Sequence, residues 1–338
     1  IKRAIIQNEN ELESIQNGNP PIDNIKKAIL NIISSQNFNS KKINKIEELS
    51  IQFEDTSVKH LLSTLFSNWG VYLASEGLTS SNIQAKNYYQ LSFEKFEKSI
   101  KLNKNNFIAY FGLATYLGKL AAISTSGIAL NYYQKAFKNY QKTIEINHLY
   151  HQAYHNWGTH LGYFANIQKS ELDAQRLLLQ GIQKQEIAIQ LITQENNSYY
   201  RQQYFASISK NLGSLGFLLK GEVAIQNFNR AIAYIKKAVD INPNDYDLNF
   251  NWGTYLAKIG DTKESLQAKE YYLQALDKFE IALKIEPNHE EQYKLYYNYG
   301  TVLFELALIS TGHEMEQFTD QALDKLKDSI ANKRSYCY

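Results

Sequence analysis

The hydrophobic positions of residues 251–288 follow the period of an α-helix twice in succession. In the first half, Trp252, Leu256 and Ile259 fall at steps of four and three residues, which places them on one face of a helix. The second half, residues 265–285, carries a longer stripe with the same period. Its members are Ala268, Tyr272, Ala275, Leu276, Phe279, Ala282 and Leu283. The segment therefore predicts a helical hairpin.

Local signals suggest where the two helices begin and end. We expect the first helix to open at Asn251 and to end at Gly260, because glycine commonly terminates helices in a left-handed conformation. Pro287 should stop the second helix, since proline cannot continue one.

The same hairpin pattern recurs along most of the chain. A small residue after a large one marks each copy, at Gly70, Ala114, Gly158, Gly213, Gly253 and Gly300. The second helices agree in phase, with Ala85, Ala129 and Ala268 in one position, Tyr89, Tyr133 and Tyr272 in another, and Phe96, Tyr140, Ile235, Phe279 and Leu326 in a third. A single hairpin buries too little apolar surface to fold alone, so the copies must stack.

The repeats predict the domain organisation. We expect a repeat solenoid over residues 61–338, with repeats at about 61–104, 105–148, 149–197, 198–244, 245–288 and 289–332. Residues 1–60 read as an irregular N-terminal helical cap or a degenerate repeat. Their expected helices are 5–15, 22–33 and 43–53, with a polar loop at 36–42.

These motifs resemble the tetratricopeptide repeat (TPR) family. That family has a large residue, Leu-Gly and then Tyr in its first helix, and Ala, an aromatic residue and Ala in its second, followed by Pro. The matching residues are Asn251, Trp252, Gly253, Leu256, Ala275, Phe279, Ala282 and Pro287. The family period is about 34 residues, whereas the copies here are 40 to 55 residues apart, as in an elongated subclass with an Asn-Trp-Gly motif. Similar elongated repeats occur in bacterial immune sensors and in the plant-type mitochondrial import receptor.

The resemblance implies an all-α, right-handed superhelical solenoid of about six TPR-like hairpins, whose first helices line a concave groove. Alignment then predicts the groove side chains: Asn68, Phe111, His155, Asn156, Lys210, Asn211, Phe250, Asn251, Tyr297 and Asn298. Asparagine amides can bond an extended backbone, and aromatic rings can hold apolar side chains. Alternatively, the asparagines satisfy backbone groups within the solenoid.

One ligand class of the family is not expected. Family members that bind chaperone tails clamp a terminal carboxylate with a lysine three residues before the marker and an asparagine two before it. Only Lys210 fits that lysine position, so a carboxylate clamp is not predicted.

Composition narrows the function further. The net charge of +2 gives no general attraction to nucleic acid or anionic membrane, and no basic stripe follows the repeats. No apolar run is long enough to span a bilayer, and no phosphate-binding or nucleophile motif is present, so we expect neither catalysis nor a cofactor. The single cysteine, Cys337, excludes an internal disulfide and fits an intracellular compartment.

A cluster of histidines is the one candidate metal site. His151 and His155 are four residues apart, with His148 before them and His160 after, a spacing that can present imidazoles to a metal. No carboxylate stands between them in an HExxH pattern, and His160 aligns with a packing position. We therefore expect structural histidines and no metal.

The preferred function is a non-catalytic scaffold that binds a partner protein or peptide segment through the groove. The chain starts at Ile1 without methionine, and residues 331–338 are too few for a capping helix, so we expect the solenoid to continue in a longer protein or to abut a partner. Two alternatives remain: a structural subunit of a large organellar or ciliary complex, and a sensor or regulatory region of a multidomain enzyme such as a bacterial immune protein.

Overall fold

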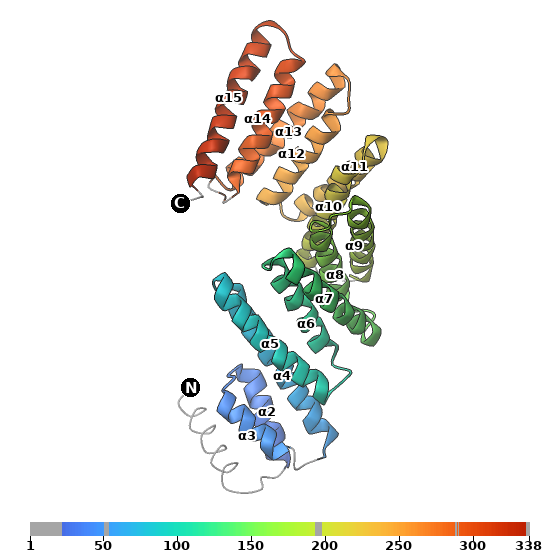
Figure 1. Cartoon of the computed structure of the whole chain (residues 1–338), viewed down its shortest axis with the longest axis vertical. Coiled ribbons are helices and arrows are strands. Elements are labelled where there is room, and N and C mark those ends of the chain that lie inside the picture. Colours follow the sequence, from blue (N-terminus) through green and yellow to red (C-terminus); the bar gives the residue numbers. More distant parts are fainter. Residues whose placement is uncertain (1–21, 51–53, 193–197, 288, 290, 336–338) are drawn as a thin grey trace. The chain divides into compact units, whose positions relative to one another are not determined.

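A computed structural model describes residues 22–50, 54–192, 198–287, 289 and 291–335. These residues form fourteen α-helices and no strand, which confirms the expected all-α class (Figure 1). The chain divides into two compact units, residues 1–157 and 158–338. Each unit is built from antiparallel helical hairpins. The superhelical hand and the domain boundary near residue 60 stay predictions.

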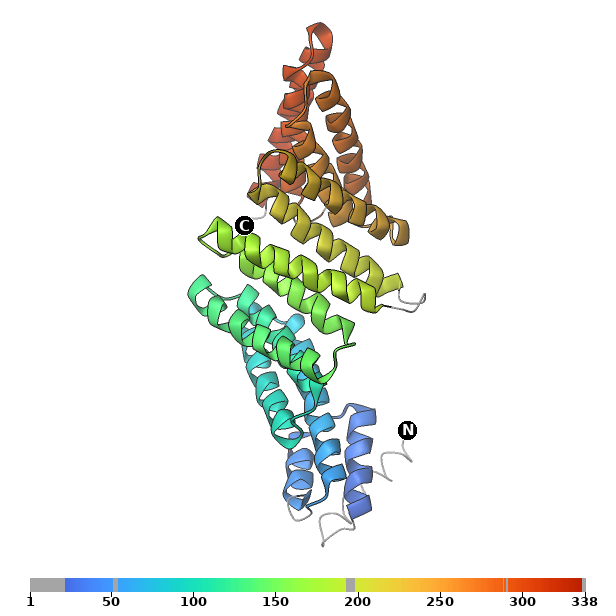
Figure 2. The same ribbon diagram turned by 90° about the vertical axis from the view of Figure 1, so that its right-hand side faces the viewer.

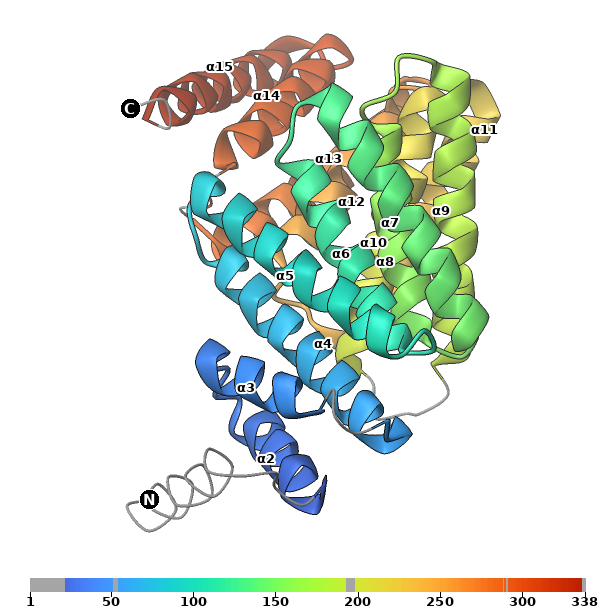
Figure 3. The same cartoon turned by 60° about the horizontal axis from the view of Figure 1, so that its bottom comes forward.

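The first unit contains a pair of short helices followed along the chain by two hairpins. Its helices are α2 (Ile22–Ser35), α3 (Ser40–Ser50), α4 (Thr56–Leu78), α5 (Asn82–Leu102), α6 (Phe107–Ala122) and α7 (Ser126–Ile146), followed by the start of α8 (His151–Ala165). The helix α4 pairs with α5, and α6 pairs with α7. Figure 3 shows α2 and α3 beside α4, and both of these short helices contact α4.

The second unit contains three complete hairpins. After the end of α8 come α9 (Glu171–Leu191), α10 (Ser198–Leu218), α11 (Gly221–Ile241), α12 (Tyr246–Gly260), α13 (Ser265–Ile285), α14 (Gln292–Leu308) and α15 (Gly312–Ser335). The pairs are α10 with α11, α12 with α13 and α14 with α15. Figure 2 shows these pairs from the side, with successive pairs packed on one another.

The marker glycines let an aromatic ring reach the first helix. A Cβ atom on Gly70 would lie 2.8 Å from the ring of Phe96, and one on Gly253 would lie 2.6 Å from the ring of Phe279. Both rings are fully buried. Because real Cβ contacts are longer than this, only glycine fits beneath the ring. The two hairpins repeat the same contact at equivalent positions.

The large residue before each marker is also held in an equivalent way in three hairpins. A lysine of the paired second helix places its ammonium over the ring, with Nζ to centroid distances of 4.3 Å for Lys95 and Trp69, 4.6 Å for Lys278 and Trp252, and 5.3 Å for Lys325 and Tyr299. Such cation–π contacts stabilise exposed sites by about 0.5–1 kcal/mol.

The predicted hairpin at 251–288 is confirmed with two corrections. The second helix spans Ser265–Ile285 as expected, and its predicted stripe is buried except for the half-buried Leu283. The first helix, however, begins at Tyr246, because Asp245 caps it by accepting a hydrogen bond from the backbone N–H of Leu248. Gly260 ends that helix without a positive φ, and its Cβ position lies 2.7 Å from the Tyr272 ring. Close packing, rather than a left-handed cap, therefore requires this glycine.

The N-terminal expectations are confirmed in part. The helix expected at 22–33 is α2, and the one expected at 43–53 is α3, which begins earlier, at Ser40, and shortens the expected loop. The helix expected at 5–15 lies outside the described residues. Among the residues described, no helix is long and apolar enough to cross a membrane.

Candidate functional site

Three first helices of the second unit, α10, α12 and α14, together line a cavity of about 330 Å³, called here the groove pocket. Its lining residues are Phe217, Thr254, Ala257, Lys258, Asp261, Tyr297, Asn298, Thr301, Val302 and Glu305. Phe217 and Tyr297 are 52% and 59% exposed, so both rings are accessible from the cavity.

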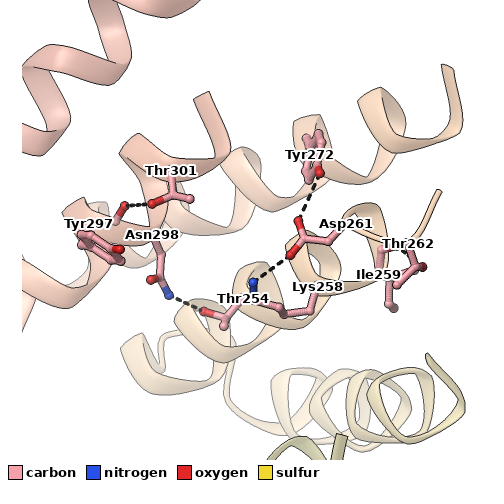
Figure 4. Close-up of polar contacts among 9 residues, drawn as sticks. All are labelled: Thr254, Lys258, Ile259, Asp261, Thr262, Tyr272, Tyr297, Asn298 and Thr301. Carbon is pink, nitrogen blue, oxygen red and sulfur yellow. Dashed lines mark hydrogen bonds and ion pairs between the residues drawn. The ribbon is translucent and has the colours of Figure 1, made fainter. Parts of the chain in front are cut away.

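Hydrogen bonds fix the polar wall of the groove pocket (Figure 4). The Asn298 Nδ2 donates to Thr254 Oγ1 at 3.1 Å, which joins α14 to α12. The hydroxyl of Thr254 donates to the backbone carbonyl of Phe250 at 2.9 Å, and that of Thr301 donates to the carbonyl of Tyr297 at 2.9 Å. Because both hydroxyl protons are used within their own helices, the threonines offer the pocket acceptor oxygens.

Two carboxylates and one ammonium give the groove pocket its charge. Lys258 Nζ lies 2.7 Å from Asp261 Oδ2, and the Tyr272 hydroxyl donates to Asp261 Oδ1 at 3.1 Å (Figure 4). Burial, reinforced by the negative charge of Asp261, raises the pKa of Tyr272, so this tyrosine remains a donor. Glu305 has no salt-bridge partner within the described part of the chain. The pocket therefore has a surplus of one negative charge and several acceptors.

A second cavity of about 410 Å³, called here the end pocket, lies between α12, α14 and α15. It is lined by Phe250, Tyr293, Lys294, Tyr297, Asn298, Ser329, Ile330 and Lys333. The ammonium groups of Lys294 and Lys333 lie 5.9 and 6.0 Å from the centre of the Tyr293 ring. Tyr297 and Asn298 line both pockets, so the two cavities share a wall.

Six of the predicted groove residues lie in the second unit, and the structure brings three of them together. Phe250, Tyr297 and Asn298 line the end pocket. Lys210 is exposed and Asn251 is half-buried, and neither lines a described cavity. Asn211 is buried, and its Nδ2 donates to the Gly158 carbonyl at 3.1 Å and to Gln185 Oε1 at 2.9 Å.

The other four predicted residues lie in the first unit. Asn68 lines a cavity of about 270 Å³ together with Gln36, Phe38, Val71, Tyr72 and Ser75. The ring of Phe111 meets Tyr150 edge-on, with centroids 5.0 Å apart. Asn156 Nδ2 donates to Thr115 Oγ1 at 3.2 Å. Burial, followed by the neighbouring His151, lowers the pKa of His155 to about 3, so this imidazole is neutral at ordinary pH.

Two asparagines make the same link between successive first helices. Asn156 bonds Thr115, and Asn298 bonds Thr254. Each asparagine lies two residues before its own marker, and each threonine lies one residue after the marker of the preceding hairpin. Of the three asparagines, only Asn211 bonds a backbone carbonyl, which is the bond that the alternative interpretation expects, whereas Asn156 and Asn298 bond threonine hydroxyls.

The histidine cluster does not form a described metal site. His151 and His155 lie on α8, and His148 is exposed in the loop before it. Among the described residues, no group of three or more His, Cys, Asp and Glu side chains is placed to hold a metal ion.

The predicted set missed several residues of the groove pocket. Phe217, Lys258 and Glu305 lie four or five residues after their marker glycines, on the next turn of their helices, and Asp261 is the C-cap residue of α12. The predicted positions extend only to one residue after each marker. Continuing the 3.6-residue period along each first helix would have included them.

No protein-family model matches the chain, and no curated protein matches it. Similar solved structures include the C-terminal part of a TPR repeat-containing protein from Cytophaga hutchinsonii, with 14% identity, a TM-score of 0.48, and coverage of 91% of this chain and 98% of that one. YrrB, described as a TPR protein with an unusual peptide-binding site, has 21% identity and a TM-score of 0.44, with coverage of 73% and 100%. A thermophilic TPR protein from Thermus thermophilus has 15% identity and a TM-score of 0.42, with coverage of 69% and 98%.

Proposed function

We propose that this chain is a non-catalytic, TPR-like interaction module of the elongated subclass, and that its groove pocket binds an extended segment of a partner protein. The observation that supports this is a cavity built by three successive first helices, with two exposed aromatic rings beside fixed hydrogen-bonding groups. Small concave sites of this kind combine apolar contact with a few placed polar groups.

The chemistry of the pocket favours a segment with hydrogen-bond donors. Acceptor oxygens come from Thr254, Thr301 and the carboxylates, and Lys258 is already paired with Asp261. Glu305 is a carboxylate without a salt-bridge partner in the described residues. A backbone supplies N–H donors, and a lysine or arginine of the segment would face Glu305. An apolar side chain of the segment would pack on Phe217 and Tyr297.

The experiment is selection from a phage-displayed random-peptide library on the chain, followed by fluorescence anisotropy with an enriched peptide. Tyr297→Ala should weaken binding at least about tenfold, since truncating a central aromatic anchor typically costs about 2 kcal/mol or more. Glu305→Gln should weaken basic peptides selectively. The matched control is Tyr199→Ala, which removes an exposed tyrosine of α10 outside the pocket.

The proposal fails if no peptide is enriched. It also fails if the enriched peptides bind Tyr297→Ala and the parent chain equally well.

A further inference from the structure

The last helix of the second unit carries a largely apolar stripe on one flank, called here the α15 flank, made of Met315, Thr319, Leu323 and Ile330. At its inner edge lies Leu326, which is half-buried because it also packs over Gly300 of α14. Met315, Leu323 and Ile330 are 43%, 51% and 57% exposed. Their spacing places them on one side of a helix. Figures 1 and 3 show α15 at the edge of the second unit, with α14 as its neighbour.

Equivalent positions in the preceding hairpin are covered. Ala268 and Leu276 of α13, 47 residues before Met315 and Leu323, are only 4% and 8% exposed. The same side of α13 packs on α14, where the rings of Phe279 and Tyr299 lie 6.0 Å apart. The α15 flank therefore has the composition of a surface on which another helix packs.

The charges along α15 indicate which helix fits. Residues 312–324 contain Glu314, Glu316, Asp320 and Asp324 and no lysine or arginine. Residues 325–335 contain a single acid, Asp328, against the basic residues Lys325, Lys327, Lys333 and Arg334. An antiparallel copy of the same helix would set each acidic half beside a basic half. The two helix dipoles would also be antiparallel, an arrangement in which they attract each other.

We propose that the α15 flank pairs with the α15 flank of a second copy of this chain, antiparallel and about a two-fold axis. In a register centred between residues 324 and 325, Leu323 faces Leu326 of the second copy, and Thr319 faces Ile330. Glu316 then lies beside Lys333 of the second copy. The spacing of 319, 323, 326 and 330 is the alternation of three and four that helix pairs use.

The size of this surface predicts a dissociable dimer. The helix has 24 residues and is therefore about 36 Å long, at 1.5 Å per residue. One helix pair of that length lies at the small end of specific interfaces. The dimer does not rest on the proposed groove function, because the groove pocket contains none of the flank residues. Ile330 also lines the end pocket, so Leu323→Glu is the variant that alters the flank alone.

Sedimentation velocity over a concentration series tests the dimer with the full chain. The parent chain should pass from monomer to dimer. Leu323→Glu and Ile330→Glu should each raise the dimer dissociation constant at least about tenfold. The matched control, Leu179→Glu, alters a leucine of α9 that is 54% exposed and should leave the constant unchanged.

Charge exchange tests the antiparallel register. Glu316→Lys and Lys333→Glu should each weaken the dimer, whereas the double variant should restore it, because both pairs at the two-fold interface are then reversed together.

A chain that is monomeric at every concentration overturns the proposal, including the case in which another segment of the chain covers the flank. A dimer insensitive to Leu323→Glu overturns it as well. If the glutamate variants lose helicity by circular dichroism, Leu323→Gln takes their place and must weaken the dimer.

Discussion

At the scale of single residues, the hairpins depend on contacts between a glycine and a ring. Gly70, Gly253 and Gly260 are needed because a ring of the paired second helix occupies the place of the missing Cβ atom. In the Gly260 hairpin, for example, that ring belongs to Tyr272, so the contact forms within one hairpin. These contacts set how closely the two helices approach.

We therefore expect Gly253→Ala to destabilise the chain. The new methyl group would lie 2.6 Å from the Phe279 ring and 2.9 Å from the Ala275 carbonyl oxygen, and overpacking of this kind costs about 1–3 kcal/mol. A lower thermal midpoint would show it. Gly127→Ala is the control, because its Cβ position has no neighbour within 4 Å, so it should be neutral or slightly stabilising. Equal midpoints for Gly253→Ala and the parent chain would contradict the packing role.

His155 predicts a specific dependence of stability on pH. Burial lowers the pKa of His155 to about 3 in the folded chain, whereas an unfolded histidine titrates near 6.5. The unfolded chain therefore binds the proton first, so the contribution of His155 is present above about pH 6.5 and is lost as the pH falls toward 3.

The comparison of the parent chain with His155→Gln isolates this effect. Below pH 6.5 the free energy of unfolding of the parent should fall more steeply than that of the variant, by up to about 1.4 kcal/mol per pH unit. Denaturant titrations at several pH values measure the difference. Parallel pH profiles would show that His155 titrates normally in the folded chain.

At the scale of helices, hydrophobic periodicity predicts the features that depend on burial, namely the position of a helix and its buried face. It identified the Ser265–Ile285 helix and its buried stripe, because burial on one face imposes the helical period on the sequence. It missed the first turn of α12, because that turn follows Pro243-Asn244 and is fixed by the polar cap of Asp245. The groove pocket was predicted only through Tyr297 and Asn298. The remaining lining depends on how far the cavity extends along each helix, which the spacing of marker residues does not encode.

Asn106 joins three helices and should matter more than a surface asparagine. Its side chain caps α6 by accepting from the Ala109 N–H at 3.3 Å, and its Nδ2 donates to Ser63 Oγ at 2.9 Å and Ser99 Oγ at 3.0 Å. Asn106→Ala removes the cap and leaves buried serines short of a partner, at a cost of about 1–2 kcal/mol. Thermal unfolding measures this cost. The adjacent exposed Asn105→Ala is the control, and an equal loss in both would contradict the joining role.

At the scale of the whole chain, hairpins of a repeat array contact mainly their neighbours, so parts of the array can fold alone. Residues 158–338 form a compact unit, and a fragment of residues 148–338 retains the whole of α8. We expect this fragment to be helical and to unfold cooperatively when heated in a circular dichroism cell. A fragment of residues 148–291 lacks α14 and α15, exposes Phe279, and should melt at a lower temperature. A long fragment without a cooperative transition would contradict the independence of this unit.

Tyr297 forms part of the wall of both pockets. A ligand that turned this ring in one cavity would change the volume of the other, so we expect the occupancies of the two cavities to be thermodynamically linked. Such linkage is reciprocal. If a ligand in one cavity changes the affinity of the other cavity by some factor, a ligand in that other cavity changes the affinity of the first by the same factor. If a partner segment binds as proposed, we expect Tyr297 to contribute to the recognition of two of its features.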